Sequence, residues 1–296
     1  MLRQLFNKLL VGLKRELRRS DYMNRRKALR LAKSSKRLDI CASQVASCLH
    51  LAGHPSVENK VCLEIGSGWV LTHALVFYLL GAKKVIATDL TPCAMPEVLS
   101  IAVNQAIESI PRDLLAPFAN YTSIRSRMDR LKRIDKFDFD CLSELGIEYV
   151  SPLDLAKTSL DIGVDFIFSN SVLEHVPVRD VEEVLNSLNK CLNSGGAMIH
   201  CIHLEDHRSS RTAPFDFLAI PNNQYTQTMQ SERGNRIRVS EWANLLGRLE
   251  KCVTSDIYSY SREDVSLTDE IDAAVRFESE ADLRVTHVGF YTRKLH

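Results

Sequence analysis

Two features are missing from this sequence: a long apolar run and a paired-cysteine motif. No run approaches the roughly 18 consecutive apolar residues of a membrane-spanning helix, and residues 1–20 lack the uninterrupted apolar core of a secretion signal. The eight cysteines show no C-x-x-C spacing, which argues against a cysteine-based zinc site. Most of them lie in apolar runs, where free cysteine behaves as a small hydrophobic residue. We therefore expect a cytoplasmic protein in a reducing compartment.

Charge is present in ordinary amount but is unevenly distributed. The formal net charge of the 296 residues is +1. Residues 1–37 hold 13 Lys and Arg against two acids, a net of +11, so the remainder of the chain carries a net of −10. This basic extension has few aromatic residues and is joined to an acidic body, which disfavours nucleic acid as a partner.

The basic extension is also amphipathic. Over residues 1–20 leucines fall on one side of a 3.6-residue helix, and lysines and arginines fall on the other. We expect this helix to contact an anionic membrane surface, so that the protein is peripheral at a membrane. Two alternatives remain: an organelle-targeting segment, or a helix packed on the domain with its charges in water. The sequence does not indicate the oligomeric state.

From residue 38 onward, short apolar runs alternate with helical patterns. Strands are predicted over 60–65, 84–88, 147–151, 164–169, 197–203, 252–258 and 283–292. Such alternation predicts an α/β fold with a doubly wound, mainly parallel seven-stranded sheet, which the last pair of strands closes as an antiparallel edge hairpin. Two segments interrupt the pattern within this 38–296 domain: an inserted helix or flap over 111–145, and a lid or acceptor loop over 204–238.

A glycine-punctuated turn follows the first predicted strand. Glycines at 66 and 68 remove the Cβ atoms that would keep a ligand from the backbone. Asp89 ends the second predicted strand, where a carboxylate can accept hydrogen bonds from both ribose hydroxyls. Leu71 occupies the place of the third glycine of a dinucleotide site, and Glu64 would repel a pyrophosphate. The turn therefore predicts a nucleoside-like ligand that carries positive charge.

This stretch resembles the first motif of class I S-adenosylmethionine-dependent methyltransferases, an acid-x-Gly-x-Gly-x-Gly loop, with Val70 in place of the last glycine. The resemblance implies S-adenosylmethionine as cofactor. It implies cofactor contacts from Glu64, Gly66, Gly68, Asp89, Asp154, Leu155 and Asn170. The first three would hold the methionine part, Asp89 the ribose, Asp154 and Leu155 the adenine, and Asn170 would lie beside the reacting methyl group. For Asp154 alone, a helix cap is the alternative.

The run from Ser169 to Val176 matches the phrase after the fourth strand of many small-molecule methyltransferases. In that family Glu174 and His175 more often shape the start of the next helix than act on substrate. This motif favours a small-molecule acceptor. Methyltransferases that methylate amide or base nitrogens carry an Asn-Pro-Pro-Tyr motif instead.

Histidines follow the fifth predicted strand, on the acceptor side of the expected pocket. A hydroxyl acceptor loses its proton as it attacks, and histidine suits that task when a carboxylate orients it. We expect His203 to be the base, with His207 as second choice and Asp206 as the carboxylate. A divalent metal bound by these three residues is an alternative. No fourth ligand is evident, so we expect no metal; ordinary loop histidines are the other alternative.

The lid segment carries a second resemblance. Residues 214–218 and 234–242 resemble uncharacterised methyltransferases associated with polysaccharide and glycoconjugate biosynthesis. There Arg236 and Arg238 would hold a phosphate, carboxylate or sugar diphosphate, unless they form a solvated edge or salt bridges. We expect methyl transfer to a hydroxyl of a saccharide, glycolipid precursor or related metabolite. The alternatives are N-methylation of a small amine or protein side chain, and a non-catalytic scaffold subunit.

Overall fold

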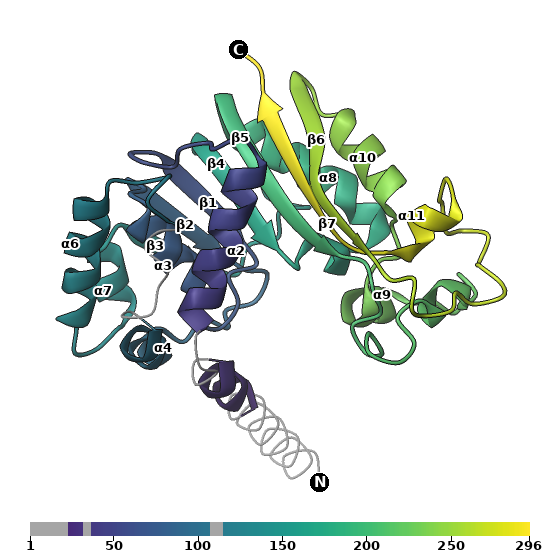
Figure 1. Cartoon of the computed structure of the whole chain (residues 1–296), viewed down its shortest axis with the longest axis horizontal. Coiled ribbons are helices and arrows are strands. Elements are labelled where there is room, and N and C mark those ends of the chain that lie inside the picture. The colour runs from purple at the N-terminus through teal and green to yellow at the C-terminus, as the bar shows by residue number, and fades with distance from the viewer. Residues whose placement is uncertain (1–22, 32–36, 107–114) are drawn as a thin grey trace, which may run out of the picture.

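The computed structural model describes residues 23–31, 37–106 and 115–296 (Figure 1). Residues 23–31 form a helix. The predicted amphipathic helix of residues 1–20 lies outside the described residues. Within these ranges, no helix has the length and apolar character needed to cross a membrane.

Seven strands form one sheet in the order β3-β2-β1-β4-β5-β7-β6. The strands are β1 (Val61–Ile65), β2 (Lys84–Thr88), β3 (Ile147–Val150), β4 (Val164–Asn170), β5 (Leu192–His203), β6 (Cys252–Ser261) and β7 (Val285–Lys294). Strands β1 to β5 pair in parallel, whereas β7 is antiparallel to both β5 and β6. The predicted sheet with its antiparallel C-terminal edge is confirmed.

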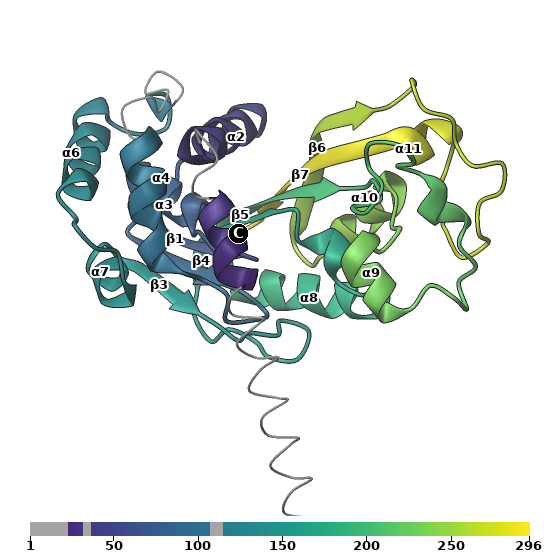
Figure 2. The same cartoon turned by 90° about the horizontal axis from the view of Figure 1, so that it is seen from below.

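Helices cover both faces of this sheet (Figures 1 and 2). One face packs on α2 (Arg37–Leu51), α3 (Thr72–Leu79), α4 (Leu99–Ala106), α6 (Tyr121–Lys132) and α7 (Phe139–Glu144), and the other on α8 (Val178–Cys191) and α10 (Val239–Gly247). Side chains of consecutive strand residues enter opposite cores, as Cys62 and Leu63 of β1 do. Because both faces are covered there, the central strands β1, β2 and β4 are largely apolar and buried rather than alternating.

The segment predicted as an inserted helix or flap is helical where it is described. Helix α6 begins after Asn120, whose side chain accepts hydrogen bonds from the backbone amides of Thr122 and Ser123. Helix α7 begins after Asp138, whose carboxylate accepts from the amide of Cys141. Each cap satisfies amide groups that the first turn of a helix leaves unpaired.

The predicted lid is a packed structure with a core of its own. It contains the 3-10 helix η3 (Asp216–Ala219) and α9 (Gln227–Arg233), and it packs against residues 262–284, which include α11 (Glu280–Arg284). Their shared core contains Phe215, Phe217, Leu218, Tyr225, Val275 and Leu283. We call residues 204–238 and 262–284 together the lid module. The sequence did not indicate the contribution of residues 262–284.

Candidate functional site

The predicted site residues gather where the parallel strands end, along the side of the sheet formed by the carboxyl ends of these strands. Parallel strands end at the same edge, so the turn after β1, the turn after β2 and the ends of β4 and β5 lie together. Strand β7 runs the opposite way and begins at this edge, where His287 is paired with His203.

The turn after β1 needs its two glycines for different reasons. Gly66 and Gly68 have φ of +66° and +65°, a region that favours glycine. A Cβ atom on Gly66 would lie 2.4 Å from a methyl carbon of Val172, whereas one on Gly68 would meet no atom within 4 Å. Val70, where the family motif has its last glycine, is buried in the core. Its side chain therefore points away from the open side of the turn.

A chain of polar contacts joins the ends of β1 and β4 through two helices. Glu64 Oε1 lies 3.3 Å from His73 Nδ1. His73 Nε2 lies 3.3 Å from Gln44 Oε1, and Gln44 Nε2 donates to Asn170 Oδ1 at 2.5 Å. Burial opposes the charge on His73, but interactions with Cys41 and Glu64 outweigh it and raise the pKa of His73 to about 10.

One carboxylate oxygen of Glu64 is available to bind a ligand. Its side chain is 2% exposed, and Oε2 has no hydrogen-bond partner among the described residues. A buried carboxylate oxygen without a partner is costly, and the ammonium group of a methionine moiety would satisfy it. Asp89 fits the ribose: its Oδ2 accepts from the amide of Gly68 at 3.0 Å and its Oδ1 from that of Thr91 at 3.1 Å. Each oxygen keeps acceptor capacity for a hydroxyl. The residues present therefore fit S-adenosylmethionine.

Asp154 and Leu155 take part in local structure. The carboxylate of Asp154 accepts from the amide of Ala156 at 3.1 Å and from Lys157 Nζ at 2.6 Å. The hydrogen bond to Lys157 lowers the pKa of Asp154. Leu155 is buried in the core that contains α8. Residues 155–157 form a turn rather than a helix, so these contacts close a turn and are not the helix cap that was the alternative for Asp154; contact with adenine stays a prediction.

Four histidine rings form a continuous cluster at the predicted acceptor side of the site. The His203 ring stacks on that of His287 with centroids 4.1 Å apart, and it lies 4.5 Å from that of His207. The His207 ring lies 4.4 Å from that of His175. Burial lowers the pKa values of His175 and His287. Both rings are therefore neutral at neutral pH.

The carboxylate beside His203 is Glu205 rather than the predicted Asp206. Glu205 Oε2 lies 2.9 Å from His203 Nε2. Asp206 is fully buried, binds Arg233 at 2.5 Å and accepts from the amide of Arg208. Its carboxylate connects Arg233 and Arg208 within the lid module and does not contact His203.

The two predicted anion-binding arginines have different surroundings. Arg238 is fully buried, and its guanidinium donates to the carbonyl oxygens of Leu204, Asp282, Leu283 and Val285. Burial lowers its pKa to about 10. We assign Arg238 a structural role, because its contacts join the two halves of the lid module to the sheet. Arg236 is also buried; it stacks on the ring of Tyr225, donates to Ile220 O and Asn222 Oδ1, and lines a cavity.

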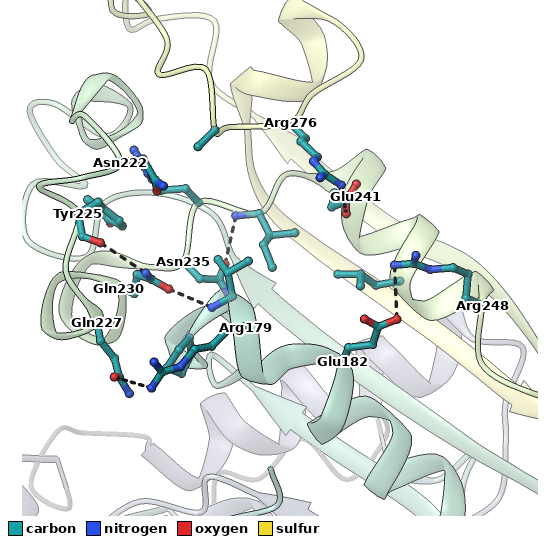
Figure 3. A pocket seen from close by; sticks show the side chains of 16 residues that line it. Arg179, Glu182, Asn222, Tyr225, Gln227, Gln230, Asn235, Glu241, Arg248 and Arg276 are labelled. Carbon is teal, nitrogen blue, oxygen red and sulfur yellow. Dashed lines mark hydrogen bonds and ion pairs between the residues drawn. The ribbon is translucent and has the colours of Figure 1, made fainter.

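That cavity has a volume of about 680 Å³ and lies between α8, α9 and α10. Figure 3 shows Arg179 beside Gln227 on one side of it and Arg276 beside Glu241 on another. Asn235, Arg236 and Ile237 line both this cavity and the small space beside Glu174, His203 and Glu205. One short stretch of lid backbone therefore separates the cavity from the histidine cluster.

A family model described as a methyltransferase domain matches residues 42–250. No curated protein matches the chain.

Several solved structures are distantly similar. An O-methyltransferase family protein from Burkholderia thailandensis is 11% identical with a TM-score of 0.45; the match covers 88% of this chain and 57% of that one. An S-adenosylmethionine-dependent methyltransferase from Mesorhizobium loti is 19% identical with a TM-score of 0.46, covering 84% of this chain and 98% of that one. The N-methyltransferase NodS from Bradyrhizobium japonicum, in complex with S-adenosyl-L-homocysteine, is 13% identical with a TM-score of 0.42, covering 93% and 99%.

Proposed function

The chain belongs to the family of methyltransferase domains and is an S-adenosylmethionine-dependent enzyme, and we propose that it methylates a hydroxyl group of a small molecule. The leading class of acceptor is a saccharide, a glycolipid precursor or a related anionic metabolite. When bound, the cofactor supplies an electrophilic methyl group. The chain's own residues hold the acceptor oxygen in line with that group and remove the acceptor's proton.

The pairing of His203 with Glu205 carries this proposal. With Nε2 donating to the Glu205 carboxylate at 2.9 Å, Nδ1 of His203 holds the lone pair that accepts the proton. Glu205 fixes the ring and stabilises the imidazolium that forms. A protonated amine needs deprotonation only before it attacks, so a positioned base acting during attack is of most use to a hydroxyl acceptor.

The 680 Å³ cavity, which residues 235–237 separate from His203, suits a polar part of the acceptor remote from the reacting hydroxyl. Its volume lies within the range of roughly 300–1,000 Å³ typical of small-molecule sites. Its wall is rich in amide and guanidinium groups, which suit the hydroxyls of a saccharide and the oxygens of a phosphate. We propose that Arg236 lies against the anionic part of the acceptor.

Replacement of His203 tests the proposal. We expect His203→Ala to slow methyl transfer about 10²–10⁴-fold, with S-adenosylhomocysteine binding unchanged. The assay uses methyl-labelled cofactor with a panel of sugar phosphates and glycolipid precursors, and His50→Ala on α2, which replaces an exposed histidine, is the control. Unchanged turnover in His203→Ala would remove this residue from the mechanism.

Two further readouts separate the alternatives. The product is identified by NMR, since an N-methyl product would replace the hydroxyl acceptor with an amine. Failure to bind S-adenosylhomocysteine at millimolar concentration would leave only a scaffold role.

We also propose that residues 1–20 bring the protein to an anionic membrane surface on the cytoplasmic side. Clustered lysines and arginines contribute about 1 kcal/mol each near such a surface. The chain of residues 38–296 should pellet less with phosphatidylserine-containing vesicles than the full chain does. Equal pelleting would exclude a membrane helix.

A further inference from the structure

We propose that Glu174, His175 and His207 bind a divalent metal ion of the zinc class at the acceptor side of the site. Sequence analysis expected no metal because the stretch from His203 to His207 offered no further ligand. The structure brings ligands from another element: Glu174 and His175 lie in the 3-10 helix η2 (Leu173–His175), which follows β4.

The three residues form a compact donor set. One ligand atom from each lies within 4.8 Å of the others. Ligands of a tetrahedral zinc ion lie about 3.4 Å apart, given metal–ligand distances of about 2.1 Å, so small side-chain rotations close the site. Two histidines and one carboxylate leave a fourth position open, as in zinc sites that act on substrates.

Two buried side-chain atoms in this group have no hydrogen-bond partner in the described residues. Glu174 is 1% exposed, and its Oε2 has no hydrogen-bond partner in the described part of the chain. Nε2 of His207 is likewise buried without a hydrogen bond; it lies 3.6 Å from Glu174 Oε1, too far for one. Burying a carboxylate this deeply is costly unless it is paired or coordinates a metal ion. A metal ion satisfies both atoms at once.

A hydrogen bond to the backbone already orients the His175 ring in the way that metal ligands are oriented. Its Nδ1 lies 2.7 Å from the carbonyl oxygen of Ser231 in α9, so that N–H group donates there and Nε2 carries the lone pair. Metal-binding histidines commonly donate their second N–H group to a backbone carbonyl in this way, which fixes the ring. The lid holds the turn as well: the amide of Asn235 donates to the carbonyl oxygen of Glu174 at 2.7 Å, and its side chain donates to Leu173 and Val176.

The neighbouring group of His203, Glu205 and His287 also has metal-ligand composition, but its atoms are occupied. Glu205 binds His203 at 2.9 Å and lies 3.5 Å from Arg262 Nη1, so its charge has partners. Glu174 meets no Arg or Lys in the described part of the chain; its Oε1 accepts from the amide of His203 at 3.3 Å and lies 3.6 Å from His207 Nε2. We therefore place the ion with Glu174 and leave His203 as the base.

The role of the ion rests on the proposed function. The amide of His203 donates to Glu174 Oε1 at 3.3 Å, so metal and base share one wall of the site. An acceptor hydroxyl bound at the open position loses its O–H proton to Nδ1 of His203. Its oxygen then forms a bond to the methyl carbon while the carbon–sulfur bond breaks. The electron pair stays on sulfur and S-adenosylhomocysteine leaves. The ion lowers the pKa of the bound hydroxyl.

Metal binding is measured directly on the full chain. Protein freed of metal by chelator is titrated with Zn²⁺ by calorimetry, and with Co²⁺ by visible absorption, which reports the coordination of the ion. We expect one ion per chain, and affinity lowered at least tenfold in His175→Ala, His207→Ala and Glu174→Gln. The last variant preserves shape and removes the charge. His50→Ala, outside the cluster, should bind like the wild type.

No binding, or binding that these variants leave unchanged, would overturn the proposal, as would a stable pair of Glu174 with protonated His207 that excludes Zn²⁺. S-adenosylhomocysteine affinity, measured on the same samples, distinguishes a failed metal site from a failed methyltransferase assignment. Thermal unfolding of each variant confirms that it is folded. Transfer at an undiminished rate in metal-free protein would overturn the catalytic role of the ion.

Discussion

The cofactor side and the acceptor side of this edge are assembled in opposite ways. The cofactor side is local: Glu64, the glycine turn and Asp89 lie within one β-α-β unit, and the Gly68 amide joins the turn directly to Asp89. The acceptor side is drawn from four separate segments, which end β4, end β5, cross the lid and begin β7. From this difference we expect one side to keep its shape when the other is disturbed.

The largest effect is expected from a substitution that disrupts the acceptor side alone. Replacing Arg238 by Met leaves the carbonyls of residues 204, 282, 283 and 285 without this donor. An unsatisfied buried group costs about 1–3 kcal/mol, so we expect a loss of at least about 3 kcal/mol. Hydrogen exchange should rise throughout the lid module and remain unchanged in β1 and β2, with affinity for S-adenosylhomocysteine preserved.

Arg248 provides the control for that experiment. It is largely exposed, and its contact with Glu182 is 3.9 Å long, so Arg248→Ala should change stability by less than about 0.5 kcal/mol. Faster exchange in β1 and β2 of the Arg238 variant would show that the two sides are not independent.

A smaller effect is expected from a substitution on the cofactor side. Gly68→Ala adds a methyl group on the open side of the turn at φ +65°, and Gly53→Ala adds one at φ +81°, also with no atom within 4 Å. Both variants bear similar backbone strain of about 1–2 kcal/mol. Only Gly68→Ala should weaken S-adenosylhomocysteine binding, by at least tenfold in a calorimetric titration. Equal affinity in the two variants would mean that the ligand does not approach the backbone here.

The last test of the comparison uses pH. The pKa of His73 rises from 6.5 to about 10 on folding. Its stabilising contribution is therefore complete below pH 6.5 and is lost as the pH rises toward 10. The difference in unfolding free energy between wild type and His73→Gln, measured by urea denaturation, should shrink over that range. A difference independent of pH would show that His73 is neutral in the folded protein.

Sequence reasoning worked wherever the signal was local. Each predicted strand overlaps an observed strand, because a buried parallel strand needs a continuous apolar run and ends at turn residues. The glycine turn and Asp89 could be identified for the same reason. Gln44 and His73 were missed, although a polar side chain within mainly apolar helices was a signal available for both.

The acceptor side was harder to predict because topology, not spacing, creates it. Glu205 was passed over for its neighbour Asp206, since a sequence does not show which of two adjacent acids meets Arg233. His287 is remote from His203 in sequence, and only the antiparallel register of β5 with β7 pairs them. Arg238 was predicted to bind an anion because a sequence does not reveal whether an arginine is buried or exposed.

The position of β7 has a consequence for how the chain folds. Strand β6 has no partner in the sheet other than β7, so it remains unpaired until β7 enters between it and β5. Such long-range pairing is slow because chain entropy is lost before the contacts form. The same insertion carries His287 to His203. We therefore expect folding intermediates in which the β1–β2 half of the sheet is native while His203 and His287 have not yet met.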